Sequence, residues 1–109
     1  MSEPVLLTKG AVACPGVVTG KVVRIYDARD SDIIQAGDIL VTEMTTPDFV
    51  PAMKRAAAIV TDKGGRTCHA AIVSRELGVP CIVGAMNATT VLKHGQEVTV
   101  DAVNGKVYE

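Results

Sequence analysis

Aromatic side chains are scarce in this chain of 109 residues. They make up 3% of the sequence, and tryptophan is absent. Single-strand nucleic-acid binders stack bases on aromatic rings, so the composition argues against that class of protein. Eleven Lys and Arg residues against twelve Asp and Glu residues leave a net charge of −1. This charge provides no general attraction for nucleic acid or for an anionic membrane surface.

Long apolar runs and paired cysteine motifs are also missing. No stretch approaches the roughly 18 uninterrupted apolar residues of a membrane span, and residues 1–4 (MSEP) do not resemble the basic start of a secretion signal. Cys14, Cys68 and Cys81 lack the CxxC spacing of a redox or zinc motif. Adjacent Cys68 and His69 would point apart on a helix, which disfavours a metal site. We expect a cytoplasmic protein with reduced cysteines, no bound metal and no membrane segment.

The apolar content is sufficient for one folded core. Apolar residues make up 48% of the chain, and a chain of this length buries roughly two thirds of its unfolded surface. No linker or repeat divides the sequence, so we expect one α/β domain over residues 1–109. Met44, Phe49 and Met53 are expected to lie in its core.

Local patterns predict alternating strands and helices. β-branched runs favour strands, and Gly20 suggests a bulge or bend within the first of them. Gly78 and Pro80 favour the end of a helix that begins near His69. Asn104-Gly105 is typical of a type I′ hairpin turn. The predicted strands cover residues 17–25, 39–41, 57–61, 81–83, 97–101 and 106–108, and the predicted helices cover residues 50–56 and 69–77.

The loop before the second helix is the candidate binding site. Strand 57–61, helix 69–77 and strand 81–83 form a plausible βαβ unit, whose ligands bind where a strand ends and a helix begins. Gly64 and Gly65 allow close approach of the backbone to an anion, and the guanidinium of Arg66 offers a forked donor to phosphate oxygens. A glycine pair alone also fits an ordinary turn. Together these residues predict a phosphate-binding loop.

His69 supplies the candidate nucleophile. The positive end of the helix dipole disfavours imidazolium by about 0.3 to 1 kcal/mol, which favours the neutral ring. A phosphoryl group accepted by the ring would lie among helix N–H groups and Arg66. By position alone, His69 also fits a packing or capping histidine, and Thr67 fits a helix N-cap. We assign Cys68 to packing or to tuning of the site, and His94 to a surface turn.

Residues 64–72 (GGRTCHAAI), continuing through residues 75–80 (RELGVP), closely resemble the phosphohistidine motif of the phosphoenolpyruvate synthase (pyruvate, water dikinase) family. The resemblance extends to residues 37–42, 44–48, 53–56 and 58–61, and towards both ends of the chain. It implies a swivelling β/β/α mobile domain. His69 then accepts a phosphoryl group that originates from ATP, through Nε2, and passes it towards pyruvate to give phosphoenolpyruvate.

The resemblance also implies roles for the neighbouring residues. Gly64, Gly65 and Arg66 belong to the phosphate environment, and Thr67 corresponds to the target of a regulatory kinase/phosphorylase in relatives. A phosphate on Thr67 would repel the phosphoryl group arriving at His69.

The expected partners are an ATP-grasp nucleotide-binding domain and a phosphoenolpyruvate/pyruvate-binding barrel, in cis or in trans. The 109 residues contain neither, so ATP and Mg²⁺ are expected to bind in those partner domains and no cofactor is expected here. One alternative is the carrier domain of a related phosphotransferase, such as pyruvate, phosphate dikinase or the sugar phosphotransferase enzyme I, where serine replaces Cys68. A non-catalytic interaction or regulatory module and a small-anion sensor are further alternatives.

Overall fold

One mixed sheet of eight strands carries the fold of residues 5–109, the part of the chain that the computed structural model describes. Residues 1–4, which we do not expect to begin a secretion signal, lie outside the described residues. The strands are β1 (Leu6–Lys9), β2 (Ala11–Cys14), β3 (Val17–Arg24), β4 (Ile39–Thr42), β5 (Ala58–Thr61), β6 (Cys81–Val83), β7 (Glu97–Asp101) and β8 (Lys106–Tyr108). Their order in the sheet is β1-β8-β7-β3-β4-β5-β6-β2.

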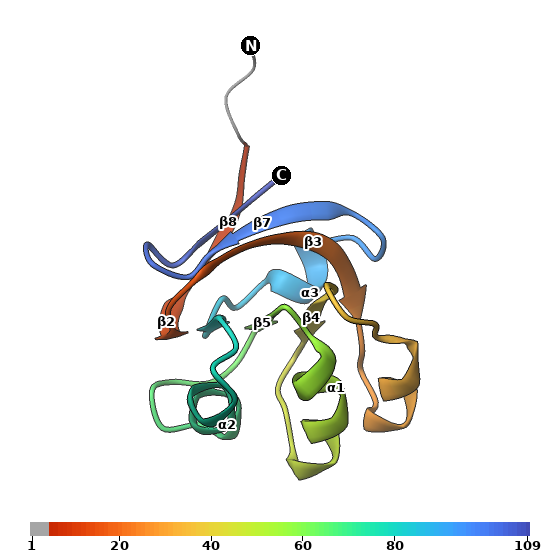
Figure 1. Ribbon diagram of the computed structural model, residues 1–109. Helices are drawn as coiled ribbons and strands as arrows, with labels where there is room; N and C mark the ends of the chain where they lie inside the picture. The colour runs from red at the N-terminus through yellow and green to blue at the C-terminus, as the bar shows by residue number, and fades with distance from the viewer. Residues whose placement is uncertain (1–4) are drawn as a thin grey trace.

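Helices are attached mainly to the parallel half of this sheet. They are α1 (Val50–Arg55), α2 (His69–Leu77) and α3 (Ala88–Val91), with 3-10 helices η1 (Ala28–Ile33) and η2 (Pro47–Phe49). Strands β3, β4, β5 and β6 run parallel, whereas β3, β7, β8 and β1 pair antiparallel. Figure 1 shows α1 and α2 below β4 and β5, with β7 and β8 on the opposite side. The layers are therefore β/β/α, which confirms the predicted α/β fold.

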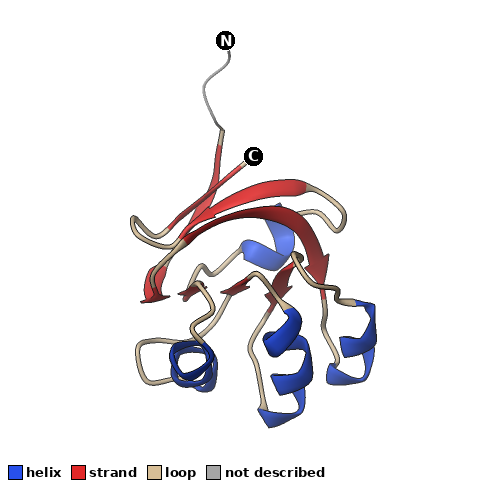
Figure 2. Ribbon diagram, viewed as in Figure 1, coloured by secondary structure: helices blue, strands red, loops and turns tan. Residues whose placement is uncertain are grey.

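Alternation along the parallel strands divides the buried side chains between two cores. Leu40 and Ile59 face the helical layer. Their strand neighbours Ile39 and Val60 face the antiparallel strands, because successive side chains of a strand point to opposite faces. Helix α3 contributes to the core between the strand layers, and Figure 2 shows it apart from the other helices.

The chain crosses between the two edges of the sheet at Gly10. It joins β1, which pairs with β8, to β2, which pairs with β6. Space at this crossing is tight: a Cβ on Gly10 would lie 2.6 Å from the carbonyl oxygen of Val83. The N–H of Gly10 also donates to the carbonyl of Gly105 at 2.9 Å. One short segment thereby links β1 and β2, the strands at the two ends of the sheet.

Most predicted elements are confirmed, and two details are corrected. Met44 is 51% exposed, so its assignment to the core is wrong, whereas Phe49 and Met53 are buried as expected. Of the bulge or bend predicted for the first strand, the bend is observed: β3 curves, as Figure 1 shows, and its register with β7 continues through Gly20. A Cβ on Gly20 would lie 2.3 Å from the carbonyl oxygen of Gly37.

The second correction concerns the last hairpin. Four residues, 102–105, connect β7 to β8, and only Gly105 among them has a positive φ, of 73°. A type I′ turn needs positive φ at both central residues, so that prediction is wrong. The carboxylate of Asp101 holds this loop by accepting the N–H groups of Val103 and Asn104 at 3.0 and 3.1 Å. Hydrogen bonds from the Asn104 side chain and backbone lower the pKa of Asp101.

No helix within residues 5–109 combines the length and the apolar character needed to cross a membrane.

Candidate functional site

The loop between β5 and α2 starts at the carboxyl ends of two adjacent parallel strands. Its first bonds continue the pairing of β4 with β5: the N–H of Asp62 donates to the carbonyl of Thr42 at 3.2 Å, and the N–H of Lys63 donates to that of Glu43 at 2.9 Å. The hydroxyl of Thr61 donates to the carbonyl of Lys63 at 2.7 Å. The loop therefore leaves the sheet with a fixed backbone.

Asp62 connects this loop to α3. Its carboxylate accepts the N–H of Thr89 at 2.9 Å and also the Thr89 hydroxyl. Its carbonyl accepts the N–H of Met86 at 2.8 Å, and Met86 has a left-handed φ of 71°. Asp62 is thus a structural brace of the site rather than a group that faces a ligand.

The two glycines of the loop have different reasons to be glycine. Gly64 has a φ of +118°, and a Cβ there would lie 2.7 Å from Sγ of Cys68. Both the conformation and the space exclude a side chain. A Cβ on Gly65 would meet no atom within 4 Å. The close packing of this loop against the start of α2 therefore depends on Gly64.

Helix α2 begins at His69, as predicted. Its N-cap residue is Cys68, and no side-chain hydrogen bond caps the helix. Thr67 is exposed one residue earlier, so the prediction that Thr67 caps the helix is wrong. The helix ends at Gly78, where φ is 71° and the N–H donates to the carbonyl of Ser74. The free N–H groups of its first turn lie beside the imidazole of His69.

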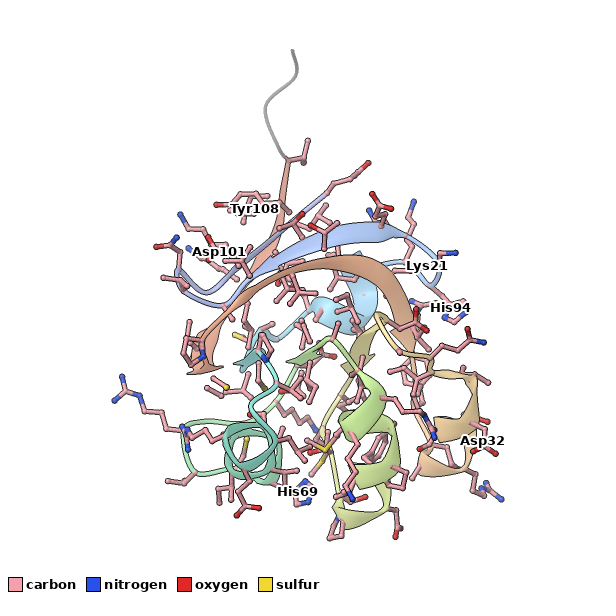
Figure 3. The ribbon with its side chains drawn as sticks, in the orientation of Figure 1. Lys21, Asp32, His69, His94, Asp101 and Tyr108 are labelled. Atoms are coloured by element: carbon pink, nitrogen blue, oxygen red, sulfur yellow. The ribbon has the colours of Figure 1, made fainter. Side chains whose placement is uncertain are left out.

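A buried threonine holds the ring of His69. Oγ1 of Thr45 lies 2.8 Å from Nδ1 of His69, and Thr45 is 4% exposed. When Nδ1 carries the proton and donates it to Oγ1, Nε2 has a free lone pair. No side-chain hydrogen bond to Nε2 occurs among the described residues. The ring is half-buried, and Figure 3 shows it at the lower edge of the domain, far from His94.

His69 opens into a small cavity of about 130 Å³. Three of the residues that line this cavity were predicted as site residues: Gly64, Cys68 and His69. Gly65 and Arg66 are exposed and lie outside its lining, as does Thr67, so their assigned roles remain predictions. The complete lining is Met44, Thr45, Lys63, Gly64, Cys68, His69 and Ala70.

Lys63, one of the residues that line this cavity, forms an ion pair with Glu43, which is not among them. Nζ of Lys63 is 2.7 Å from Oε1 of Glu43, with 66% and 53% of the two side chains exposed. The hydrogen bond to Glu43 is the main reason why the pKa of Lys63 is raised. The ammonium group is therefore charged at neutral pH.

The three cysteines are free thiols that gather beneath the site. Cys14 and Cys81 are opposite each other in the β2–β6 pair, and Cys68 packs against the same core. Burial raises the pKa of Cys81 to about 12, partly offset by a hydrogen bond with Ser74. Cys81 is thus an inert packing group, while half-buried Cys68 lines the cavity.

The sequence analysis assigned no role at this site to three residues: Thr45, Lys63 and Glu43. A signal for them exists in the pattern, because residues that follow adjacent parallel strands meet at one edge of a sheet. Within residues 5–109 no group of three or more His, Cys, Asp or Glu side chains is arranged to hold a metal ion.

Comparisons with known proteins agree with this geometry. The family model described as "PEP-utilising enzyme, mobile domain" matches residues 34–105. Phosphoenolpyruvate synthase of Pyrococcus furiosus is 61% identical over 109 residues, which are 100% of this chain and 13% of that protein. Probable phosphoenolpyruvate synthase of Archaeoglobus fulgidus is 62% identical over 108 residues, 99% of this chain and 14% of that protein.

A solved structure supports the same assignment. The solution structure of Enzyme I (nEIt) has 34% sequence identity and a TM-score of 0.61, and the match covers 72% of this chain and 32% of that one. Together with the β/β/α layers, these similarities define a mobile domain with a histidine at the start of α2. The chain belongs to the mobile-domain family of PEP-utilising enzymes.

Proposed function

We propose that this domain carries a phosphoryl group on Nε2 of His69 in a phosphoenolpyruvate synthase-like reaction. It accepts the group from ATP and passes it towards pyruvate to give phosphoenolpyruvate. The observation that carries the proposal is the 2.8 Å contact between Thr45 Oγ1 and Nδ1 of His69. With the proton on Nδ1 and donated to this oxygen, the lone pair lies on Nε2, which then acts as the nucleophile.

The transfer needs no proton to leave the imidazole. The Nε2 lone pair forms an N–P bond while the bond from phosphorus to its leaving oxygen on the nucleotide breaks. Nδ1 keeps its proton and shares the positive charge of the phosphorylated ring, and Thr45 Oγ1 accepts that proton in a hydrogen bond. In the second half of the cycle a base of the barrel domain takes a methyl proton from pyruvate, the enolate oxygen forms the O–P bond, and the N–P bond breaks.

The phosphoryl oxygens would lie near the first turn of α2. Free N–H groups there and the positive end of the helix favour an anion, and the space beside Gly65 is open. Arg66 is assigned a supporting role for the phosphoryl charge. Its exposed side chain suits a group that adjusts when phosphate or a partner arrives.

The curated relatives support further domains as partners, because the chain spans 13% of the length of the Pyrococcus furiosus protein. We assign ATP and Mg²⁺ to an ATP-grasp domain and pyruvate to a barrel domain. Thr67, exposed two positions before His69, fits a regulatory kinase/phosphorylase. The expected compartment is the cytoplasm.

Labelling with radioactive phosphate tests the carrier function. The chain is incubated with Mg²⁺, β- or γ-labelled ATP and the remaining domains of a phosphoenolpyruvate synthase relative. We expect a label that is lost in acid and stable in base, as for phosphohistidine, and that pyruvate removes as labelled phosphoenolpyruvate.

His69→Ala and His94→Ala form a matched pair of variants. Label should disappear in the first and persist in the second. An acid-stable label, or one that survives His69→Ala, contradicts the proposal. Stable partner binding without any label indicates a non-catalytic interaction module, and phosphate binding that depends on Gly64 and Arg66 but not on His69 indicates an anion sensor.

A further inference from the structure

The cationic residue that lines the cavity of His69 is not the arginine of the glycine loop. Lys63 lines the cavity with His69, whereas Arg66 does not. Lys63 already has a partner, since its Nζ is 2.7 Å from Oε1 of Glu43. Two anions can therefore compete for Lys63: the carboxylate of Glu43 and a phosphoryl group on His69.

We propose that Lys63 exchanges Glu43 for the phosphoryl oxygens when His69 is phosphorylated. Glu43 thus stores the ammonium group beside the cavity while His69 is unmodified. This inference rests on the proposed carrier function. It assigns Lys63 as the principal cation of that site and Glu43 as the residue that competes for the cation.

The backbone is built for such an exchange. The N–H of Lys63 donates to the carbonyl of Glu43 at 2.9 Å, and the Thr61 hydroxyl donates to the carbonyl of Lys63 at 2.7 Å. The Cα positions of Lys63 and Glu43 therefore stay fixed at the ends of β5 and β4. Both side chains are more than half exposed, and a lysine stem can swing its compact ammonium between partners.

The energetics favour the exchange in one direction only. An exposed ion pair contributes little to stability, so opening it costs little. A phosphoryl group brings a charge close to −2 and three strong acceptor oxygens, whereas Glu43 offers a single negative charge. Before phosphorylation Lys63 stays with Glu43, and afterwards the phosphoryl group is the stronger partner.

Chemical phosphorylation tests this inference on the chain alone. Phosphoramidate transfers a phosphoryl group to accessible imidazoles, and mass spectrometry of peptides separates the product on His69 from that on His94. His94 is exposed, with its Nδ1 accepting the N–H of Arg24 at 3.2 Å, and serves as the internal reference. The measured quantity is the ratio of the two initial rates.

Lys63→Gln and Glu43→Gln should change this ratio in opposite directions. Losing the cation should lower it about tenfold, because a charge-assisted hydrogen bond to the phosphoryl group is lost. Losing the competing acid should raise it about two- to threefold. Lys63→Arg should retain most of the rate. Lys9→Gln, at an exposed lysine of β1 that pairs with β8, should leave the ratio unchanged.

The sign of the Glu43 effect separates this exchange from a structural ion pair. If the pair only positions the loop, both glutamine variants break the same contact and both lower the ratio, which overturns the inference. An unchanged ratio in Lys63→Gln also overturns it. Failure of the carrier function is recognised separately, because His69 of the unaltered chain would then take no label from ATP with the partner domains.

Discussion

Replacing Thr45 by valine removes the hydroxyl that holds Nδ1 of His69 and keeps the branched shape of the side chain. Thr45 is 4% exposed, so valine should keep the packing of this buried side chain. The imidazole would lose the contact that keeps the proton on Nδ1, and Nε2 would carry the proton for part of the time. Phosphorylation at Nε2 should slow as a result.

The expected size of the effect follows from the single 2.8 Å bond. One hydrogen bond between uncharged groups contributes about 0.5 to 1.5 kcal/mol net. With 1.36 kcal/mol for each factor of ten, the rate should fall about 2- to 10-fold. Thr45→Ser keeps the hydroxyl and should recover most of the loss.

The assay is the phosphoramidate reaction, with His94 as the internal reference. Thr8→Val is the matched control: Thr8 is also buried, at 6% exposure, and its hydroxyl bonds Asn87 at 2.7 Å, remote from the cavity. Nitrogen-15 NMR of the imidazole reports the tautomer directly. In the unaltered chain the proton should lie on Nδ1, and in Thr45→Val both tautomers should be populated.

Two results would refute this reasoning. The first is an unchanged His69 rate in Thr45→Val with a folded spectrum. The second is a proton on Nε2 in the unaltered chain, since Thr45 would then be the donor and Nδ1 the acceptor. In that case the threonine opposes the nucleophile instead of preparing it.

Further substitutions probe the loop and the thiols. Gly64→Ala should lower the free energy of unfolding by about 1 to 3 kcal/mol, owing to its left-handed φ, whereas Gly65→Ala should change it little; equal denaturation midpoints would contradict this difference. Arg66→Ala should slow phosphorylation of the chain and leave the melting temperature nearly unchanged; a sharp fall in melting with an intact rate would make its role structural. With iodoacetamide at pH 8, half-buried Cys68 should be alkylated in the native protein, while Cys81, with a pKa of about 12, should react only after unfolding; early labelling of Cys81 would count against its burial.

The sequence predicted local structure correctly where that structure depends on residues that are neighbours in the chain. Helix α2 ends at Gly78 because a residue without a Cβ adopts the left-handed φ there. The apolar run of β5 and the loop after it likewise predicted a βαβ unit, and β5 and β6 pair parallel. The position of His69 at the first turn follows from these two elements.

The sequence did not predict features that depend on residues far apart in the chain. Residues 6–14 form two strands, β1 and β2, because β8 and β6 offer them open edges. Their own pattern predicted neither strand. Asn104-Gly105 has the residue types of a two-residue turn, but the carboxylate of Asp101 closes a longer loop. Met44 is apolar yet exposed beside the cavity, which no local pattern distinguishes from a core residue.

The amino-acid sequence by itself determined the α/β class, the helix that starts at His69 and the need for glycine before it, because these depend on backbone preference and short-range spacing. Only the tertiary structure decided that Thr45 holds the ring and that Lys63, paired with Glu43, lines the cavity. The physical reason is the parallel pairing of β4 with β5, which brings side chains some twenty residues apart to the same edge of the sheet. Their contacts exist only once that pairing is complete.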